Sequence, residues 1–229
     1  MVHIFDVDDT VIKKSSARHF LFEAMNAGLI RFSQIYGLPV EWLKYKLGRP
    51  DTDFVEKAVK RLAGIEKNAL EQVAEACFER RIKPNIYTDA ARLITEVRER
   101  GETVIFATSS LHTLIRPLER FFGIEGSLAG ELEFRDGKTT GCLVAGSLFG
   151  VKKKAAVEVW LGRNGLSPGE VCFYSDSYTD IPLLEICGRP VAVNPDRILA
   201  KKAKKNGWEI KRFRETTRLC RLKNHGSAD

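Results

Sequence analysis

The sequence predicts an α/β protein built on a mostly parallel sheet that is covered by helices on both faces. Short apolar segments with high β propensity occur at VHIFDV (2–7), TVIFA (103–107) and VCFY (171–174). Helical patterns separate the later segments, and such alternation favours parallel strands joined by crossover helices. Polar residues follow each apolar segment, and ligands bind at this carboxyl edge in parallel sheets.

A helical block interrupts this alternation after the first strand. Ser15 or Ser16 is a candidate N-cap, and apolar residues recur at helical spacing from Phe20 to Met25. Further helical patterns follow at Pro39–Leu47, from Thr52 onward and at Asn68–Arg81. Because the block contains helices and no expected strand, we predict a helical cap inserted into a core domain. The predicted ranges are 13–84 for the cap, and 1–12 with 85–229 for the core.

The alternation of strands and helices resumes after Pro84. Thr88 or Asp89 is the candidate cap of a helix that runs to Arg100, and Gly101 ends it. The elements expected after the 103–107 strand are a helix at Leu111–Phe122, a hairpin at Glu131–Gly141 around Asp136-Gly137, a helix at Lys153–Asn164, the strand Val171–Tyr174, a helix at Thr179–Ile186, a strand at Val191–Val193 and a helix at Arg197–Asn206. The tail Lys223–Asp229 is expected to be disordered.

Length and composition exclude several classes of protein. A chain of 229 residues can bury a core, and 44% hydrophobic with 29% charged residues is typical of a soluble domain. No segment has the run of about 18 apolar residues that a membrane span needs. The N-terminus reaches Asp6 too early for a secretion signal. The five cysteines are scattered without a CxxC pair, which favours reduced thiols in a cytoplasmic protein.

The net charge of +7 comes from a segment near the C-terminus. Residues 197–223 contain eleven Lys or Arg and two Glu, so the remainder of the chain carries a slight acidic excess. A basic segment can bind nucleic acid or anionic lipid, but a solvated helix face with a polar tail has the same composition. The segment lacks an RNA-binding aromatic signature and zinc-finger spacing. The charge therefore does not decide the function: no membrane partner is expected, and a solvated surface is favoured over a nucleic-acid partner.

The first candidate site group is the run Asp6-Val7-Asp8-Asp9-Thr10, at the tip of the first strand. Alternate side chains of an extended chain share a face, so Asp6 and Asp8 can point into one cleft. Two carboxylates brought together repel each other, and a bound cation or a shared proton relieves that repulsion. A Mg²⁺ ion or a proton-donating Asp would follow from these two solutions. A solvated turn with incidental acidic residues is the alternative.

Two further groups carry hydroxyls and cations. The run Thr108–Ser110 follows the TVIFA strand, where hydroxyl and N–H groups at the start of a helix can hold an anion or simply cap the helix. The run Lys152–Lys154 opens a later helix. Cations are disfavoured at a helix N-terminus, so a lysine there either neutralises a bound phosphate or points into solvent.

The fourth group is Asp176-Ser177-Tyr178-Thr179-Asp180, after the strand VCFY. Acidic side chains there would lie at the same edge of the sheet as Asp6 and could complete an oxygen-rich Mg²⁺ site. Taken alone, this group could also be an Asp-rich turn that caps a helix. The order of acid pair, hydroxyls, lysines and second acid pair favours one catalytic site over four separate coincidences.

In this order the four groups resemble the motifs of the haloacid dehalogenase superfamily, in particular its phosphoserine-phosphatase-like branch (subfamily IB). FDVDDT resembles the first motif, ATSS the second, Lys153 the third and YSDSYTD the fourth. The resemblance covers most of the chain, and the helical insertion between the first two motifs suits this branch. It implies a Rossmann-like core with an inserted C1-type helical cap. It also implies a cytoplasmic, Mg²⁺-dependent phosphoric monoester hydrolase.

The resemblance further implies a role for each matching residue. Asp6 would attack phosphorus to form an aspartyl-phosphate, and Asp8 would protonate the leaving alcohol and then activate water. Lys153 would neutralise the phosphoaspartate; Lys152 and Lys154 remain alternatives, although the apolar face of the helix favours Lys153. The implied metal-site residues are Asp6, Asp8, Asp176 and Asp180. The implied phosphate-binding residues are Thr108, Ser109, Lys153 and Thr179.

The chain departs from true phosphoserine phosphatases at Ser15. Those enzymes carry a Glu nine residues after the nucleophile, where it reads the amino group of the substrate, and here that position is Ser15. The departure argues against phosphoserine as the natural substrate and makes Ser15 a candidate substrate contact. Arg18, with nearby Lys13 and Lys14, could favour an extra acidic group on the ligand or could be an ordinary surface charge.

Three functions fit this set of residues. Hydrolysis of a small phosphomonoester is the leading prediction, because Asp8 supplies the proton that a leaving alcohol needs. Phosphotransfer to an alcohol would use the same aspartyl-phosphate and the same residues. A non-catalytic binder of a phosphorylated ligand or nucleic acid would not need an acid–base pair. The sequence leaves the oligomeric state and the physiological substrate open.

Overall fold

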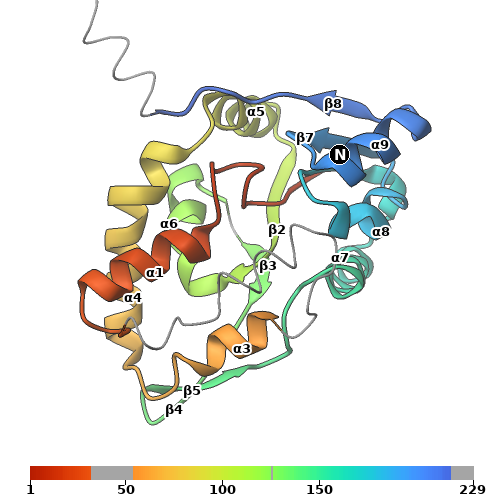
Figure 1. The fold of residues 1–229 in the computed structure, drawn as a ribbon. Coiled ribbons are helices and arrows are strands. Elements are labelled where there is room, and N and C mark those ends of the chain that lie inside the picture. Colours follow the sequence, from red (N-terminus) through yellow and green to blue (C-terminus); the bar gives the residue numbers. More distant parts are fainter. Residues whose placement is uncertain (32–53, 125, 218–229) are drawn as a thin grey trace, which may run out of the picture.

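In the computed structural model of the chain, six parallel strands form the central sheet (Figure 1). Their order is β3-β2-β1-β6-β7-β8, so the first strand of the chain lies inside the sheet. The strands are β1 (Val2–Phe5), β2 (Thr103–Leu111), β3 (Ser127–Gly130), β6 (Val171–Ser175), β7 (Arg189–Val193) and β8 (Glu209–Lys211). The structure describes residues 1–31, 54–124 and 126–217. The helix expected at Pro39–Leu47, the first residues of the one expected from Thr52, and the tail Lys223–Asp229 lie outside these ranges.

Alternating side chains along the strands build a hydrophobic layer on each face of the sheet. Val104 and Phe106 of β2 belong to one layer, whereas Ile105 and Ala107 belong to the other. The first layer is covered by α5 (Thr88–Glu99) and α6 (His112–Phe122). The second layer is covered by α7 (Val151–Arg163), α8 (Ile181–Leu184) and α9 (Arg197–Asn206). The predicted α/β class with a parallel sheet covered on both faces is therefore confirmed.

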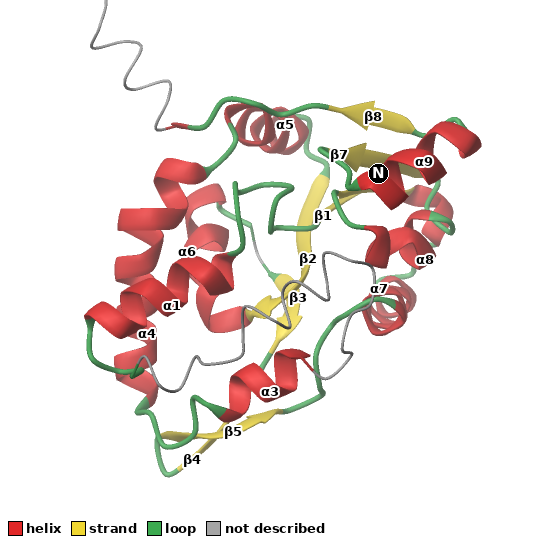
Figure 2. Cartoon of the chain, viewed as in Figure 1, coloured by secondary structure: helices red, strands yellow, loops and turns green. Residues whose placement is uncertain are grey.

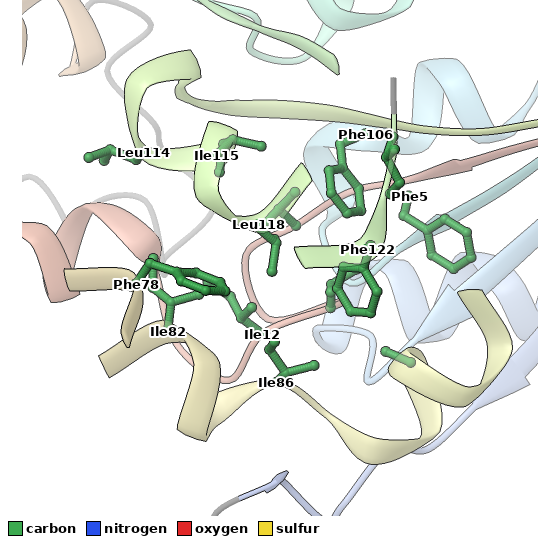
Figure 3. Packing of buried hydrophobic residues seen from close by; sticks show 14 of the residues in the cluster. Phe5, Ile12, Phe78, Ile82, Ile86, Phe106, Leu114, Ile115, Leu118 and Phe122 are labelled. Atoms are coloured by element: carbon green, nitrogen blue, oxygen red, sulfur yellow. The ribbon is translucent and has the colours of Figure 1, made fainter. Parts of the chain in front are cut away.

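The segment after β1 adds helices to the first layer. Its described helices are α1 (Ser16–Asn26), α3 (Phe54–Lys60) and α4 (Lys67–Cys77). Helix α4 packs against both α1 and α6 (Figures 1 and 2). A π-helical turn, Phe78–Ile82, follows α4, and its apolar side chains lie beside Ile12 in the cluster that contains Phe106 (Figure 3). Because this segment shares its core with the sheet, the division into a cap at 13–84 and a core stays a prediction.

The expected hairpin forms at the Asp136-Gly137 turn. It consists of β4 (Leu132–Arg135) and β5 (Lys138–Leu143), which pair antiparallel and apart from the main sheet. Both turn residues have positive φ, 50° at Asp136 and 76° at Gly137, as the tight turns that suit hairpins require. The hairpin is joined to the helical segment, because the N–H of Gly64 donates to the carbonyl of Thr139.

Several boundaries differ from the sequence-based expectation. β1 ends at Phe5 rather than at Val7, and β2 continues past Ala107 to Leu111, with irregular pairing to β3. The helix expected at Thr179–Ile186 is a 3₁₀ turn followed by the short helix α8. β3 and β8 were not expected, because each is short and takes its structure from pairing at an edge of the sheet.

Within the described ranges, no helix combines the length and the apolar character needed to cross a membrane. The cysteines in that part of the chain, namely Cys77, Cys142, Cys172 and Cys187, are free thiols.

Candidate active site

The predicted site residues come from segments that meet at the carboxyl edge of the sheet. Phe5 of β1 pairs with Tyr174 of β6 on one side and with Phe106 of β2 on the other. Asp6 follows Phe5 directly and its N–H donates to the carbonyl of Tyr174 at 2.9 Å. The first and fourth sequence groups begin where β1 and β6 end, and the second lies in the last residues of β2, so all three meet at one edge of the sheet as predicted.

Lys153, near the start of α7, is buried between two carboxylates. Its Nζ donates to Oδ1 of Asp6 at 2.9 Å and to Oδ2 of Asp180 at 2.8 Å. Lys153 is 4% exposed and Asp6 is 6% exposed, so this contact is shielded from water. Lys152 is exposed and Lys154 is half-buried, and they pair with Glu56 and Glu158 rather than with the aspartates. Of the three consecutive lysines, the structure brings Lys153 to the aspartates.

The aspartates at this edge carry more negative charge than one ammonium group balances. Burial raises the pKa of Asp6 to about 7 despite the opposing charge of Lys153, and the charge of Asp180 adds to the rise. Burial, followed by the charges of Asp6 and Asp9, holds the pKa of Asp176 well above its ordinary value. Burial alone would lower the pKa of Lys153, but the carboxylates of Asp180 and Asp6 outweigh this effect. The pKa is raised overall, so the amine stays protonated. A bound cation would relieve the remaining repulsion.

The arrangement of carboxylate oxygens at the site is compatible with a Mg²⁺ ion that takes one or two ligands from the protein. Oδ2 of Asp180 accepts from Ser175 Oγ at 2.7 Å, whereas its buried Oδ1 has no hydrogen-bond partner within the described part of the chain. Thr10 Oγ1 lies 3.4 Å from Oδ1 of Asp176. Among the described residues, no three acidic, His or Cys side chains already surround one point closely enough to hold an ion. Mg²⁺ commonly takes one or two carboxylates and fills its remaining positions with water and phosphate oxygens.

Asp8 makes a separate set of contacts with serine residues. The N–H of Ser16 donates to its Oδ1 at 2.8 Å, and Ser110 Oγ donates to its Oδ2 at 3.1 Å. Burial raises the pKa of Asp8, and the hydrogen bonds from Ser16 and Ser110 offset only part of the rise. A carboxyl group with a raised pKa keeps its proton to higher pH than an ordinary Asp, which suits a general acid.

The run Thr108–Ser110 differs in local structure from the expectation that it begins a helix. Thr108 and Ser109 lie within β2, and α6 begins only at His112. The N–H of Ser110 is taken by Thr108 Oγ1 at 3.1 Å. The expected helix start at this run is therefore wrong, because the chain stays extended to Leu111 and the hydroxyl of Thr108 bonds the local backbone. The phosphate contact from the N–H of Ser109 stays a prediction. Thr108 is fully buried and Ser109 is half-buried at this strand end.

Of the remaining predicted residues, Thr179 lies close to the aspartates, whereas Ser15 and Arg18 make no polar contact with them in the described part of the chain. Thr179 is half-buried in the loop that carries Asp180, and its Oγ1 lies 2.9 Å from Ser177 Oγ. Ser15 precedes α1 as its N-cap residue, but its side chain makes no capping bond. Arg18 is exposed on α1. Within the described ranges no hydrogen bond or ion pair joins the side chain of Ser15 or Arg18 to the aspartates.

With this geometry established, comparison with known proteins places the chain. Residues 4–185 match the family model described as haloacid dehalogenase-like hydrolase. The chain belongs to this family. Phosphoserine phosphatase SerB1 of Mycobacterium tuberculosis is 32% identical to it over 224 residues, which cover 95% of this chain and 72% of that protein. Histidinol-phosphatase of Neisseria meningitidis is 30% identical over 217 residues, covering 92% of this chain and 98% of that protein.

Solved structures show the same fold. A protein of unknown function from Bordetella pertussis Tohama I superposes with a TM-score of 0.79 at 26% identity, covering 92% of this chain and 97% of its own. A substrate-bound phosphoserine phosphatase superposes with a TM-score of 0.68 at 18% identity, covering 97% of each chain. The chain is thus an enzyme of the haloacid dehalogenase-like hydrolase family, with the fold of its phosphatases.

Some contacts of this hydrolase site involve residues that the sequence did not single out. Asp196 donates from its N–H to the carbonyl of Asp176 at 2.9 Å, and its Oδ2 accepts from the N–H of Tyr178 at 2.7 Å. Its Oδ1 caps α9 by accepting from Ile198 and Leu199. The signal for capping was available, because an Asp directly before a helical pattern is a common N-cap. The bonds to the 176–178 loop depend on tertiary packing and leave no local pattern.

Proposed function

We propose that this protein hydrolyses a small phosphomonoester through an aspartyl-phosphate on Asp6. The buried contact between Lys153 and Asp6 carries the proposal. The ammonium group favours the ionised form of Asp6, which a nucleophile needs. It would also offset the negative charge that a phosphoryl group brings to the site. A purely structural ion pair would not require the further carboxylates of Asp8 and Asp176 at the same strand ends.

The proposed reaction has two steps that share Asp8 as the proton carrier. In the first step an oxygen of Asp6 bonds to phosphorus, the bond from phosphorus to the alcohol oxygen breaks, and Asp8 protonates that oxygen. In the second step Asp8 takes a proton from water, and the water oxygen displaces Asp6 from phosphorus to give inorganic phosphate. Asp8 regains its proton and Asp6 its negative charge, so each cycle consumes one water molecule.

The proposed cofactor is Mg²⁺, with Asp6, Asp176 and the carbonyl of Asp8 as its protein ligands and Asp180 as a supporting carboxylate. Its chemistry would be to offset negative charge on the phosphoryl group. The excess negative charge at the strand ends supports this assignment. Thr108, Ser109 and Thr179 would contact the phosphoryl oxygens.

The helical segment 13–84 is proposed to cover the site and select the substrate. Its support is the hydrogen bond from Ser16, the first residue of α1, to Asp8. The names of two relatives specify phosphoserine and histidinol phosphate, and both compounds are small phosphomonoesters that carry an amine. We propose a substrate of this size class. Ser15 in place of the amine-reading Glu argues against phosphoserine itself.

Release of inorganic phosphate from a substrate panel tests the proposal. The panel contains phosphoserine, histidinol phosphate, sugar phosphates and simple alkyl phosphates, each assayed with Mg²⁺ and with EDTA. Wild-type protein should turn over at least one of them, and both EDTA and Asp6→Asn should abolish turnover. Asp136→Asn makes the same chemical change in the exposed hairpin turn and should leave it intact. Phosphate release by Asp6→Asn at the wild-type rate would refute the proposal, and phosphorylated alcohols among the products would instead indicate transfer.

A further inference from the structure

Two serine hydroxyls from distant parts of the chain meet beside Asp8. Ser16 begins α1, and Ser110 lies near the end of β2. Their Oγ atoms are within hydrogen-bonding distance of each other. Both residues are buried, Ser16 completely and Ser110 to within 6% of its surface. Neither has a role in the reaction steps proposed above.

The direction of the hydrogen bonds follows from the number of protons. A serine hydroxyl has a single proton to donate and can accept through its lone pairs. While Asp8 is ionised, Ser110 donates its proton to Oδ2 of Asp8, so the proton between the two hydroxyls then comes from Ser16. A chain of hydrogen bonds therefore runs from Ser16 Oγ through Ser110 Oγ to Asp8. Each bond in such a chain polarises and strengthens the next.

The other carboxyl oxygen of Asp8, Oδ1, is bonded directly by Ser16. Its backbone N–H donates to Oδ1 at 2.8 Å. The terminal torsion of an Asp side chain is broad, so a single donor leaves the carboxyl plane free to turn. One donor on each oxygen fixes that plane. Ser16 thus acts on Oδ1 directly and on Oδ2 through Ser110.

We infer that Ser110 and Ser16 are positioning residues that aim the carboxyl group of Asp8 at the leaving oxygen of the substrate. The inference rests on the proposed function, in which Asp8 is the proton donor. A misaligned donor slows proton transfer but leaves the nucleophile and the phosphate-binding groups in place. Loss of either hydroxyl should therefore slow only those substrates whose leaving group needs a proton.

The test compares kcat/KM for an alkyl phosphate and for p-nitrophenyl phosphate. An alkoxide must be protonated as it leaves, whereas p-nitrophenolate departs without a proton. kcat/KM reports the steps up to transfer onto Asp6 and excludes later hydrolysis of the intermediate. Because general acid catalysis typically contributes about a hundredfold or more and depends on alignment, Ser110→Ala should lower kcat/KM for the alkyl phosphate at least about tenfold. The same variant should change the value for p-nitrophenyl phosphate less than about threefold.

Further variants separate positioning from a merely structural effect. Ser16→Ala keeps the N–H bond to Asp8, so its selective loss should be smaller than that of Ser110→Ala. The double variant should lose less than the product of the two single losses, because the Ser16 hydroxyl contacts Asp8 in part through Ser110. Ser110→Thr keeps a hydroxyl on a strand that favours β-branched residues and should restore the alkyl phosphate rate. Ser127→Ala, a half-buried serine on β3, should affect neither substrate.

Asp8→Asn distinguishes failure of the inference from failure of the proposed function. If Asp8→Asn selectively slows the alkyl phosphate while Ser110→Ala and Ser16→Ala slow both substrates equally or neither, the positioning role is overturned and the proposed function stands. If Asp8→Asn shows no such selectivity, or wild type turns over neither substrate, the proton-donor role fails and the inference fails with it. A selective loss in Ser16→Ala also supports the inference if Ser110→Ala does not fold.

Discussion

The ammonium group of Lys153 lies 2.9 Å from Oδ1 of Asp6, and both side chains are almost completely buried. The same group lies 2.8 Å from Oδ2 of Asp180. Buried charges lose their hydration, so this cluster is stable only while each charge keeps its partner. The contact therefore links the stability of the protein to its proposed catalytic role, and both can be measured in one variant.

Lys153→Met should damage both properties. Removal of one partner from a buried ion pair should lower the free energy of unfolding by about 3 kcal/mol. Loss of the charge that faces the phosphoryl group should lower kcat/KM at least about a hundredfold. Urea unfolding and steady-state kinetics measure the two effects. Lys152→Met and Lys154→Met are the matched controls, since both lysines pair with Glu side chains rather than with the aspartates, and comparable losses in either would contradict the assignment.

Asp176→Asn should separate metal binding from folding. Thermal unfolding of wild type should shift upward with Mg²⁺, because a ligand at about a hundred times its Kd adds about 2.7 kcal/mol. The variant should lose most of this shift. Without metal at alkaline pH it should be at least as stable as wild type, because an amide is not repelled by Asp6. Asp136→Asn should keep the wild-type shift, and an undiminished Mg²⁺ shift in Asp176→Asn would count against the proposed site.

The raised pKa of Asp6 predicts the pH dependence of the metal-free protein. The folded protein holds this proton up to about pH 7, whereas an ordinary Asp releases it near 3.8. The folded state binds more protons in that window, so the stability from Asp6 is fully present below the ordinary pKa and is lost as pH rises through about 7. In EDTA, the free energy of unfolding of wild type should fall with rising pH relative to that of Asp6→Asn. Parallel pH profiles for the two proteins would contradict the predicted shift.

Asp196→Ala should weaken Mg²⁺ binding, although Asp196 is not one of the proposed metal ligands. The side chain caps α9 and holds the N–H of Tyr178, next to the loop that carries Asp176. Loss of the cap should cost about 1 kcal/mol of stability. Loss of the loop contact should raise the Mg²⁺ concentration for half-maximal activity severalfold, with kcat near wild type at saturating metal. Ser167→Ala removes a cap elsewhere and should cost stability alone; an equal change in its Mg²⁺ requirement would make the effect non-specific.

Sequence reasoning placed Asp6 and Asp176 together because the carboxyl ends of neighbouring parallel strands meet at one edge of a sheet. It favoured Lys153 over its neighbours because helical periodicity puts that lysine on the buried face. Of the apolar residues three, four and seven positions on, Val157 is fully buried, and Ala156 and Trp160 are half-buried. These conclusions needed only local patterns and the general geometry of α/β sheets.

The remaining features depend on contacts between distant segments. The Ser16–Ser110 contact joins residues 94 positions apart, and nothing near either serine signals it. The extension of β2 through Thr108 also has no local signal, because hydroxyl residues suit a helix cap as well as a strand end. β3 was missed for a related reason, since Ser127–Gly130 is a four-residue segment with Leu128 as its single large side chain, and it forms a strand only beside β2.

The most direct test of the central claim is to trap the phosphoryl group on Asp6. In Asp8→Asn, transfer from p-nitrophenyl phosphate needs no proton donor, but water is no longer activated, so the aspartyl-phosphate should accumulate. After an acid quench, peptide mass spectrometry should find roughly one phosphoryl group per chain on the peptide that contains Asp6, as covalent catalysis requires. Asp6→Asn should carry none. Turnover by wild type with no phosphoryl group on that peptide in Asp8→Asn would contradict the proposed mechanism.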